Sequence, residues 1–188
     1  MEQKIHPLKK MNLPEKKFNW KKEIKVFLIN ITIALTISFL IISNIAQAYR
    51  VEGESMEPGL LDNERIIVSK IIYKLREIKR GEVVIFRYPS KPQKYFIKRI
   101  IGLPGETVFI EKGDIYVNNQ KLNEPYLKSD FKSQETTPST FIPSGYYYVL
   151  GDHRTSSNDS RNGWLVPRKY IIGKAVFRYW PLKRTGTL

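Results

Sequence analysis

An uncharged stretch of 24 residues, from Val26 to Tyr49, restricts the fold of this 188-residue chain more than any other feature. Built as an α-helix at about 1.5 Å per residue, the stretch would be roughly 36 Å long, which is enough to cross a bilayer. The apolar region of a cleaved signal peptide is shorter, at about 7–15 residues, so an uncleaved anchor fits better. A buried helix of a soluble core is the alternative, and this length disfavours it. We therefore predict one transmembrane helix over residues 26–49.

The residues on either side of this stretch carry very different charge. Residues 1–25 contain eight lysines and three glutamates, whereas only Arg50 follows the stretch directly. Because positive residues gather on the cytoplasmic side of a span, we predict a basic cytoplasmic tail over 1–25 and an extracytoplasmic domain over 50–188. The net charge of +14 could also suit nucleic acid. Its concentration beside the apolar stretch indicates the lipid bilayer as the partner instead, and we expect no nucleic-acid partner.

Residues 50–188 read as many short strands. Apolar or alternating segments lie between turns rich in glycine, proline and asparagine, at 64–69, 82–88, 95–101, 107–110, 114–117, 146–150 and 171–180. This pattern predicts a mainly β domain, an antiparallel barrel or sandwich. Residues 71–79 are compatible with a short helix, and the polar stretch 128–140 with a flexible excursion. The chain has no cysteine, which excludes disulfides and thiolate metal sites.

Lys98 is the most informative residue of the predicted strands. It lies between Ile97 and Ile100 in an apolar run that stops at the turn Pro104-Gly105. An isolated lysine more often extends its charged end from a half-buried strand into water. If Lys98 is buried instead, desolvation disfavours its ammonium form, and a neutral amine can act as a base.

Ser55 lies in a second informative segment, beside the turn Pro58-Gly59. Gly53 allows close approach of another backbone, so the serine is expected near a bend. Most serines beside turns only complete the turn. The segment does not fit the G-x-S-x-G pattern because residue 57 is glutamate, which disfavours the nucleophile elbow of α/β-hydrolases.

A polar segment, residues 149–163, follows another predicted strand. It fits an ordinary surface loop, but it also supplies hydroxyl groups that could orient a lysine. Asp159 and Arg161 are spaced to form an ion pair within it.

Four segments in this order resemble the bacterial type I signal peptidases: Ser55-Met56-x-Pro58, Arg80–Phe86, Lys98–Glu106 and Gly151–Arg161. The resemblance covers nearly the whole chain from the apolar stretch onward. It implies an antiparallel β domain, tethered by an N-terminal span, that uses a Ser/Lys dyad to cut signal peptides from exported proteins. It also implies that no metal or cofactor is needed. The 103–150 region is short, as in the compact members of that family.

The resemblance implies roles for individual residues. Ser55 corresponds to the nucleophile, Lys98 to the general base and Ser157 to the residue that orients the lysine. Asp159 and Arg161 correspond to a structural pair behind the site. Position 53 departs from longer relatives, which have a hydroxyl residue there as an oxyanion donor, whereas this chain has glycine. Glycine at 59 and histidine at 153 replace the common threonine and asparagine.

The substrate implied by the resemblance is a signal peptide, cut after a small-x-small sequence. We expect it to bind extended, with its backbone along residues 51–55 and 95–98. The residues expected to contact it are Gly53, Glu54, Met56, Pro58, Tyr95 and Ile97. Ala46-Gln47-Ala48 matches the same cleavage pattern, so the chain could cut a second copy of itself after Ala48.

Other interpretations remain open from the residues. The segment Ser129–Lys132 fits the S-x-x-K motif of penicillin-binding proteins, but the chain lacks K-T-G and S-D-N. His153 could be the base, although neighbouring Asp152 is poorly placed to orient it. Self-cleaving repressors share Ser/Lys chemistry but carry a DNA-binding segment. A membrane-tethered binding module without activity would not need Ser55, Lys98 and Ser157 together.

Overall fold

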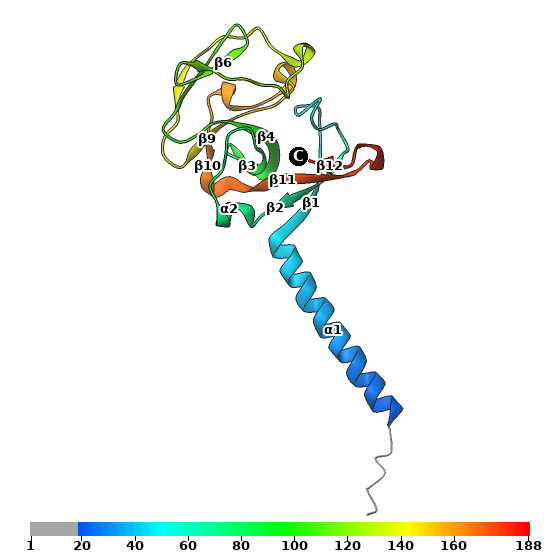
Figure 1. Cartoon of the computed structure of the whole chain (residues 1–188). Helices are drawn as coiled ribbons and strands as arrows, with labels where there is room; N and C mark the ends of the chain where they lie inside the picture. The colour runs from blue at the N-terminus through cyan, green and yellow to red at the C-terminus, as the bar shows by residue number, and fades with distance from the viewer. Residues whose placement is uncertain (1–18) are drawn as a thin grey trace, which may run out of the picture. The chain divides into compact units, whose positions relative to one another are not determined.

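The structure is a computed structural model that describes residues 19–188 (Figure 1). Residues 1–18, most of the predicted basic tail, lie outside the described residues. The chain forms two compact units, Met1–Leu40 and Ile41–Leu188. The first contains most of helix α1, and the second contains the strands of the described chain.

Helix α1 covers Trp20–Ile45. It begins before the uncharged stretch because Asn19 caps it: Asn19 Oδ1 accepts a hydrogen bond from the Lys22 backbone N–H at 3.3 Å. The 21 residues Trp20–Leu40 have a mean hydropathy of 1.8 and are exposed along their length. By length and composition this helix could cross a membrane.

The end of the helix differs from the expected bounds of the span, 26–49. Residues Ala46–Arg50 form strand β1, which pairs antiparallel with β2 (Arg65–Ser69) and places Ala48 opposite Ile67. Alanine and glutamine are good helix formers, so local sequence gives no signal for this change. Residues 46–50 form a strand because they pair with β2, since strand formation depends on tertiary context.

The larger sheet contains eight antiparallel strands within residues 19–188, in the order β1-β2-β11-β3-β4-β9-β10, with β12 paired to β11. The bounds of the strands not yet given are β3 Val83–Tyr88, β4 Lys91–Gly102, β9 Tyr146–Leu150, β10 Val166–Pro167, β11 Ile171–Trp180 and β12 Gly186–Thr187. The prediction of a mainly β, antiparallel fold is confirmed.

Strand β3 lies at the centre of this sheet and is buried on both faces. Val84 and Phe86 pack in one hydrophobic cluster with Ile100 of β4. Ile85 packs in a second cluster with Met56. A strand buried on both sides holds its neighbour β4 rigidly, and β4 carries Lys98.

A second, smaller sheet has the strand order β7-β6-β5-β8. Its strands are β5 Thr107–Glu111, β6 Asp114–Val117, β7 Gln120–Lys121 and β8 Thr137–Phe141. Figure 1 shows β6 at the end of this unit away from β1 and β2. The chain leaves the larger sheet after Gly102 and returns along β9, where Tyr148 lies opposite Gly102.

The prediction of a flexible excursion over 128–140 is wrong for its last residues. Strand β8 pairs with β5, and Thr137 Oγ1 accepts a hydrogen bond from the Ile110 backbone N–H at 3.2 Å. The strand contains Pro138 and few apolar residues, so it shows no strand periodicity, and an edge strand tolerates proline. The short helices are α2 Ile72–Leu75, η1 Ser129–Phe131, η2 Arg154–Ser156, η3 Ser160–Asn162, η4 Arg168–Tyr170 and η5 Leu182–Arg184.

Candidate active site

The side chains of Ser55 and Lys98 meet at one point of the β unit. Lys98 Nζ donates a hydrogen bond to Ser55 Oγ over 2.5 Å, although the two residues are 43 positions apart. This distance is short enough for direct proton transfer between the hydroxyl and the amine. The pair is therefore arranged as a nucleophile and its base.

Strand β4 places Lys98 opposite Val84 of the central strand β3. The burial predicted for Lys98 is confirmed, because only 4% of the residue is exposed. Its Nζ lies 5.5 Å from the centre of the Phe96 ring. Burial removes the amine from water and favours its neutral form, whereas the ring face favours the ammonium form.

Burial lowers the pKa of Lys98 from 10.5 to about 8. Desolvation is the largest cause, and the buried carboxylates Asp159 and Asp152 oppose it by stabilising the ammonium form. The guanidinium of Arg161 lowers the pKa further by charge repulsion. A substantial neutral fraction is therefore present at mildly alkaline pH.

The segment from 51 to 64 holds Ser55 in a fixed turn. Val51 N–H donates to the Glu64 carbonyl at 2.8 Å, and Leu60 N–H donates to the Met56 carbonyl at 2.9 Å. Met56 and Leu60 are each 1% exposed and anchor the turn in the hydrophobic core. The burial of Met56 and Leu60 therefore fixes the position of Ser55.

Gly53 adopts a left-handed φ of +84°, which favours glycine, and open space surrounds the position of a Cβ. Its N–H donates to Asp62 Oδ1 at 2.8 Å, so this N–H is already engaged. The backbone N–H of Ser55 makes no hydrogen bond within residues 19–188. Of these two N–H groups, only that of Ser55 is available to an oxyanion.

Gly151 lies in tight contact with the Ser55 segment. A Cβ at this position would lie 2.4 Å from the Ser55 carbonyl oxygen and 2.2 Å from Ser157 Oγ. The next residues continue the contact, since His153 N–H donates to the Ser55 carbonyl at 3.1 Å. The loop after β9 therefore packs directly on the backbone of the nucleophile.

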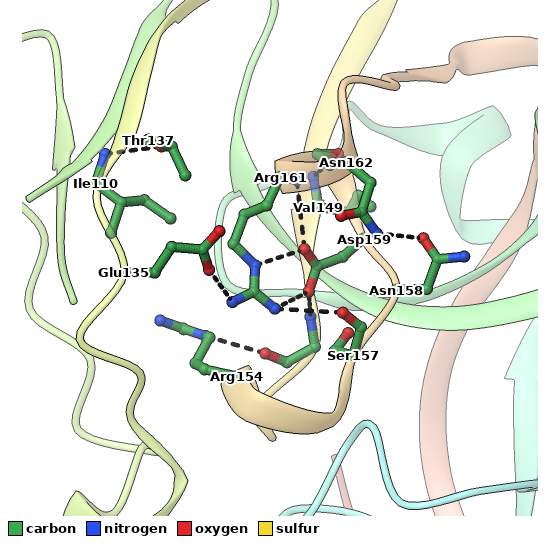
Figure 2. Close-up of polar contacts among 12 residues, drawn as sticks. Ile110, Glu135, Thr137, Val149, Arg154, Ser157, Asn158, Asp159, Arg161 and Asn162 are labelled. Carbon is green, nitrogen blue, oxygen red and sulfur yellow. Dashed lines mark hydrogen bonds and ion pairs between the residues drawn. The ribbon is translucent and has the colours of Figure 1, made fainter.

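An ion pair behind the site fixes this loop. Asp159 is fully buried, and its carboxylate accepts hydrogen bonds from Arg161 Nε at 2.8 Å and from the Gly151 N–H at 3.0 Å. Figure 2 shows the Arg161 guanidinium between Asp159 and Glu135, whose carboxylate lies 2.8 Å from Arg161 Nη1. The sequence-based expectation placed Asp159 and Arg161 together, and the structure brings them together.

Ser157 lies beside this pair, as Figure 2 shows. Its Oγ is buried and has no hydrogen-bond partner within the described part of the chain. Both the Ser157 hydroxyl and the Ser55 carbonyl pack against Gly151, so Ser157 lies near the Ser55 segment. The Ser157 hydroxyl does not hydrogen-bond to Lys98 in this structure.

A groove of about 890 Å³ leads to Ser55 and Lys98. One wall is the chain from Ala48 to Glu54, and the other is β4 from Gln93 to Ile97. Both walls have a free backbone edge among the described strands: β1 ends the sheet order, and β9 pairs with β4 only from Arg99 onward. Such edges can accept a further strand.

Comparison with known proteins decides the family. Residues 24–180 match the family described as signal peptidase, peptidase S26. The chain belongs to this family. Signal peptidase IB of Staphylococcus aureus (strain COL) is 38% identical over 177 residues, which cover 86% of this chain and 92% of that protein. The probable signal peptidase I-2 of Synechocystis sp. is 42% identical over 150 residues, 77% of this chain and 67% of that protein.

A crystal structure of a signal peptidase I from Enterococcus faecalis V583 is 32% identical to this chain, with a TM-score of 0.46. The matched region covers 53% of this chain and 97% of the chain in that crystal structure. As a member of the signal peptidase family, the present protein is a serine peptidase of the kind that removes signal peptides.

The residues expected to contact substrate divide into two groups in this signal peptidase. Gly53, Glu54, Tyr95 and Ile97 line the groove. Met56 and Pro58 do not line it: Met56 is buried in the core, and the Pro58 carbonyl accepts a hydrogen bond from Arg184. Residues near a nucleophile in sequence can therefore support the turn without facing substrate.

Sequence reasoning missed several residues of the site. Tyr49 and Asn158 line the groove, and the Tyr49 and Tyr95 rings lie 6.1 Å apart across it. Arg99 pairs with the buried Asp152, with Nη2 and Oδ2 2.6 Å apart, and lies next to Lys98 on β4. A second charged residue inside an apolar strand was the available signal for Arg99, but its partner is 53 positions away.

The alternative bases and nucleophiles lack support in the geometry. His153 points its ring at Phe131, with centroids 4.8 Å apart, and its buried Nδ1 has no hydrogen-bond partner in residues 19–188. Asp152 binds Arg99 and so does not orient His153. Ser129 Oγ donates to Asp130 at 3.0 Å on the exposed surface.

Proposed function

We propose that this protein is a membrane-anchored serine endopeptidase that removes signal peptides after a small-x-small sequence, with Ser55 as nucleophile and Lys98 as general base. The observation that carries the proposal is the 2.5 Å contact between Lys98 Nζ and Ser55 Oγ at the inner end of the groove. Membership of the signal peptidase family supports the same reaction.

The chemistry follows from this contact. The neutral Lys98 amine accepts the Ser55 hydroxyl proton while Oγ attacks the scissile carbonyl carbon. The tetrahedral intermediate then collapses, the peptide C–N bond breaks, and the Lys98 ammonium gives its proton to the leaving amine. An ester links the signal peptide to Ser55. Lys98 next accepts a proton from water, hydroxide adds to the ester, and the proton returns to Ser55 Oγ as the signal peptide leaves.

The negative oxygen of the intermediate needs hydrogen-bond donors. The free backbone N–H of Ser55 supplies one, as in other serine hydrolases where the nucleophile's own amide contributes. Gly53 has no side-chain donor, and its N–H is held by Asp62. This distinguishes the chain from the longer relatives that place a hydroxyl residue at that position.

The groove suits an extended peptide. Its two free edges can pair with the backbone of a substrate strand, whose alternate side chains then point to the same side. Val51, Ile66 and Ile85 line the inner part of the groove. These apolar side chains suit small apolar substrate residues, which supports the small-x-small preference.

The anchor sets where this reaction takes place. The lysines before α1 support a cytoplasmic N-terminus, with residues 50–188 outside the cytoplasm in the cell membrane. Enzyme and precursor would then share one membrane face, which raises their effective concentration.

The test is cleavage of a secretory precursor. Detergent-solubilised full-length protein is incubated with the precursor, and the new N-terminus is sequenced. A single cut after a small-x-small sequence, absent from Ser55→Ala, is expected. Equal cleavage by Ser55→Ala and the unaltered protein would contradict the assignment of Ser55.

A further inference from the structure

Glu64 is a buried carboxylate that the proposed reaction does not use. It is 2% exposed and follows the turn that carries Ser55. Its Oε2 accepts a hydrogen bond from the Leu61 N–H at 3.0 Å and lies 3.2 Å from Arg178 Nη1. Its Oε1 lies 3.1 Å from Arg184 Nε, an ion pair by distance, and makes no hydrogen bond within residues 19–188. A buried charge is tolerated because two guanidinium groups face it.

Both arginines also bind the backbone of the Ser55 turn. Arg178 Nη1 donates to the Gly59 carbonyl at 2.8 Å, and Arg184 Nη2 donates to the Pro58 carbonyl at 3.2 Å. These carbonyls lie three and four residues after the nucleophile. Each guanidinium therefore connects Glu64 to the turn, and the fixed geometry of the guanidinium sets the position of both ends.

The other side of the turn is also fixed. A Cβ on Gly59 would lie 3.1 Å from Oδ2 of the buried Asp152, which is paired with the half-buried Arg99. Gly59 thus lies between two groups of ion-paired side chains. A change on the Arg184 side would shift the turn relative to Lys98, because β4 does not move with it.

The arginines come from the C-terminal end of the chain. Arg178 is on β11, within the family match that ends at residue 180, and Arg184 is on η5, beyond it. Leu188 packs against the cluster that contains Met56. Residues near the C-terminal end of the chain therefore contact the turn that carries Ser55.

We propose that Glu64, Arg178 and Arg184 form a positioning clamp that holds the Ser55 hydroxyl at hydrogen-bond distance from Lys98 and so controls the rate of acylation. The proposal rests on the proposed function in taking Ser55 as the nucleophile. The clamp does not touch the substrate groove, so it acts on the reacting geometry without affecting peptide binding. A displacement of about 1 Å at a reacting atom can lower a rate on the order of a hundredfold.

The test compares Arg184→Gln with Lys183→Ala in the detergent-solubilised full-length protein. Lys183 is the exposed neighbour on the same short helix and provides the matched control. With a fluorogenic signal-peptide substrate, Arg184→Gln should lower kcat about tenfold while KM changes by less than about twofold, which is the pattern of a lost transition-state interaction. The acid limb of the pH profile should not move, since Arg184 is not among the charges that shift Lys98.

A double-mutant cycle with Glu64→Gln adds a second readout. Because both residues act through one clamp, the double variant should lose about as much kcat as the more damaging single variant. Circular dichroism and thermal unfolding report how much of each variant is folded. If Arg184→Gln does not fold, Arg184→Lys takes its place, since lysine retains the charge but cannot bridge Glu64 and the carbonyl.

The outcomes separate cleanly. A folded Arg184 variant with unchanged kcat, or a loss that only follows the fraction of unfolded protein, overturns the clamp. If the two losses of kcat multiply in the double variant, Arg184 and Glu64 act independently, and the clamp is also contradicted. Failure of the proposed function looks different, because Ser55→Ala would then remain active whatever Arg184 does.

Discussion

Lys98 Nζ lies 2.5 Å from Ser55 Oγ, and the two atoms are held by different kinds of structure. The lysine stands on β4, against a strand that is buried on both faces. The serine stands on a turn that depends on its contacts with the loop after β9 and with the C-terminal residues. The position of the base thus depends on the packing of β3 and β4, and that of the nucleophile on the contacts of its turn.

The pH dependence of cleavage should follow Lys98. Its pKa is lowered to about 8, so the neutral base is scarce below that pH and its fraction rises as the pH increases through 8. The logarithm of kcat/KM should therefore rise with pH and level off above about 8. An acid limb near the ordinary histidine range, about 6.5, would contradict the assignment.

Replacement of the base tests the same assignment directly. Lys98→Ala should lower kcat by about 10²–10⁴-fold without loss of the fold, and Lys98→Arg should not restore it because arginine stays charged. His153→Asn is the matched control: it keeps the backbone N–H that binds the Ser55 carbonyl, and activity should be nearly unchanged. Survival of Lys98→Ala together with loss in His153→Asn would reverse the roles.

Removal of Arg161 should shift the acid limb. Arg161→Gln leaves the buried Asp159 carboxylate without its main partner and also removes a positive charge that lowers the Lys98 pKa. Both effects raise that pKa, so the acid limb should move to higher pH. The unpaired buried charge should also destabilise the fold by about 3–5 kcal/mol.

The shift is measured from pH profiles, and the stability from urea unfolding. Lys132→Gln, which removes an exposed positive charge, is the control and should change neither. A limb that stays in place or moves to lower pH in Arg161→Gln would show that this pair does not act on Lys98.

Gly151 should not tolerate alanine. The added methyl group would lie 2.4 Å from the Ser55 carbonyl oxygen and force the turn away from Lys98. We expect a loss of kcat on the order of a hundredfold, the effect of a displacement of about 1 Å. Gly186→Ala, where the Cβ would meet open space, should keep full activity. Equal activities of the two variants, measured on one precursor, would exclude the contact as a determinant of the site.

Much of the fold was predictable because its core strands carry their own pattern. The predicted strands at 82–88 and 95–101 correspond to β3 and to most of β4. Strand β8 was missed, since a polar strand with proline at a sheet edge has little periodicity. Strand β1 was missed because its residues continue an apolar helix and only the partner β2 makes them a strand.

The site was predictable where one residue is unusual in its own surroundings. A lysine inside an apolar strand indicates its own burial, and Lys98 is buried. Ion pairs such as Glu64–Arg178 have no local signal, because charged residues are common and these two are 114 positions apart. The order of strands in the sheet determines which charged side chains form pairs. That order cannot be read from the local sequence pattern.

Topology can be tested with protease added outside spheroplasts. Residues 50–188 should be digested and the first 25 residues spared, because the lysines before α1 favour the cytoplasmic side. Antibodies against each end detect the fragments, and lysed spheroplasts should lose both ends. A C-terminal domain that is protected until lysis would require the opposite orientation.

Cleavage after Ala48 should be slow and intermolecular. Ala48 forms part of the groove wall, on a strand paired with β2, and only six residues lie between it and Ser55, so we expect that it does not bind as substrate in its own groove. In a second copy, β1 must first separate from β2, where Ala48 is paired with Ile67. The initial rate should therefore rise with the square of enzyme concentration.

Mass spectrometry of concentrated enzyme should reveal a fragment that begins at Tyr49. Ser55→Ala alone should stay intact. The same fragment in both samples would indicate a contaminating protease.

The chain leaves the larger sheet after Gly102 and returns to it along β9, where Tyr148 lies opposite Gly102. The residues between these two points therefore form an insertion whose two ends lie side by side. On the return path, Glu124 and Glu135 hold Arg154 and Arg161 of the loop behind the site. The hairpin tip at Asn118 and Asn119 is exposed and joins β6 to β7. A fluorescent protein with neighbouring termini, spliced into this tip, should leave the groove unaltered and give a signal peptidase that can be followed in living cells.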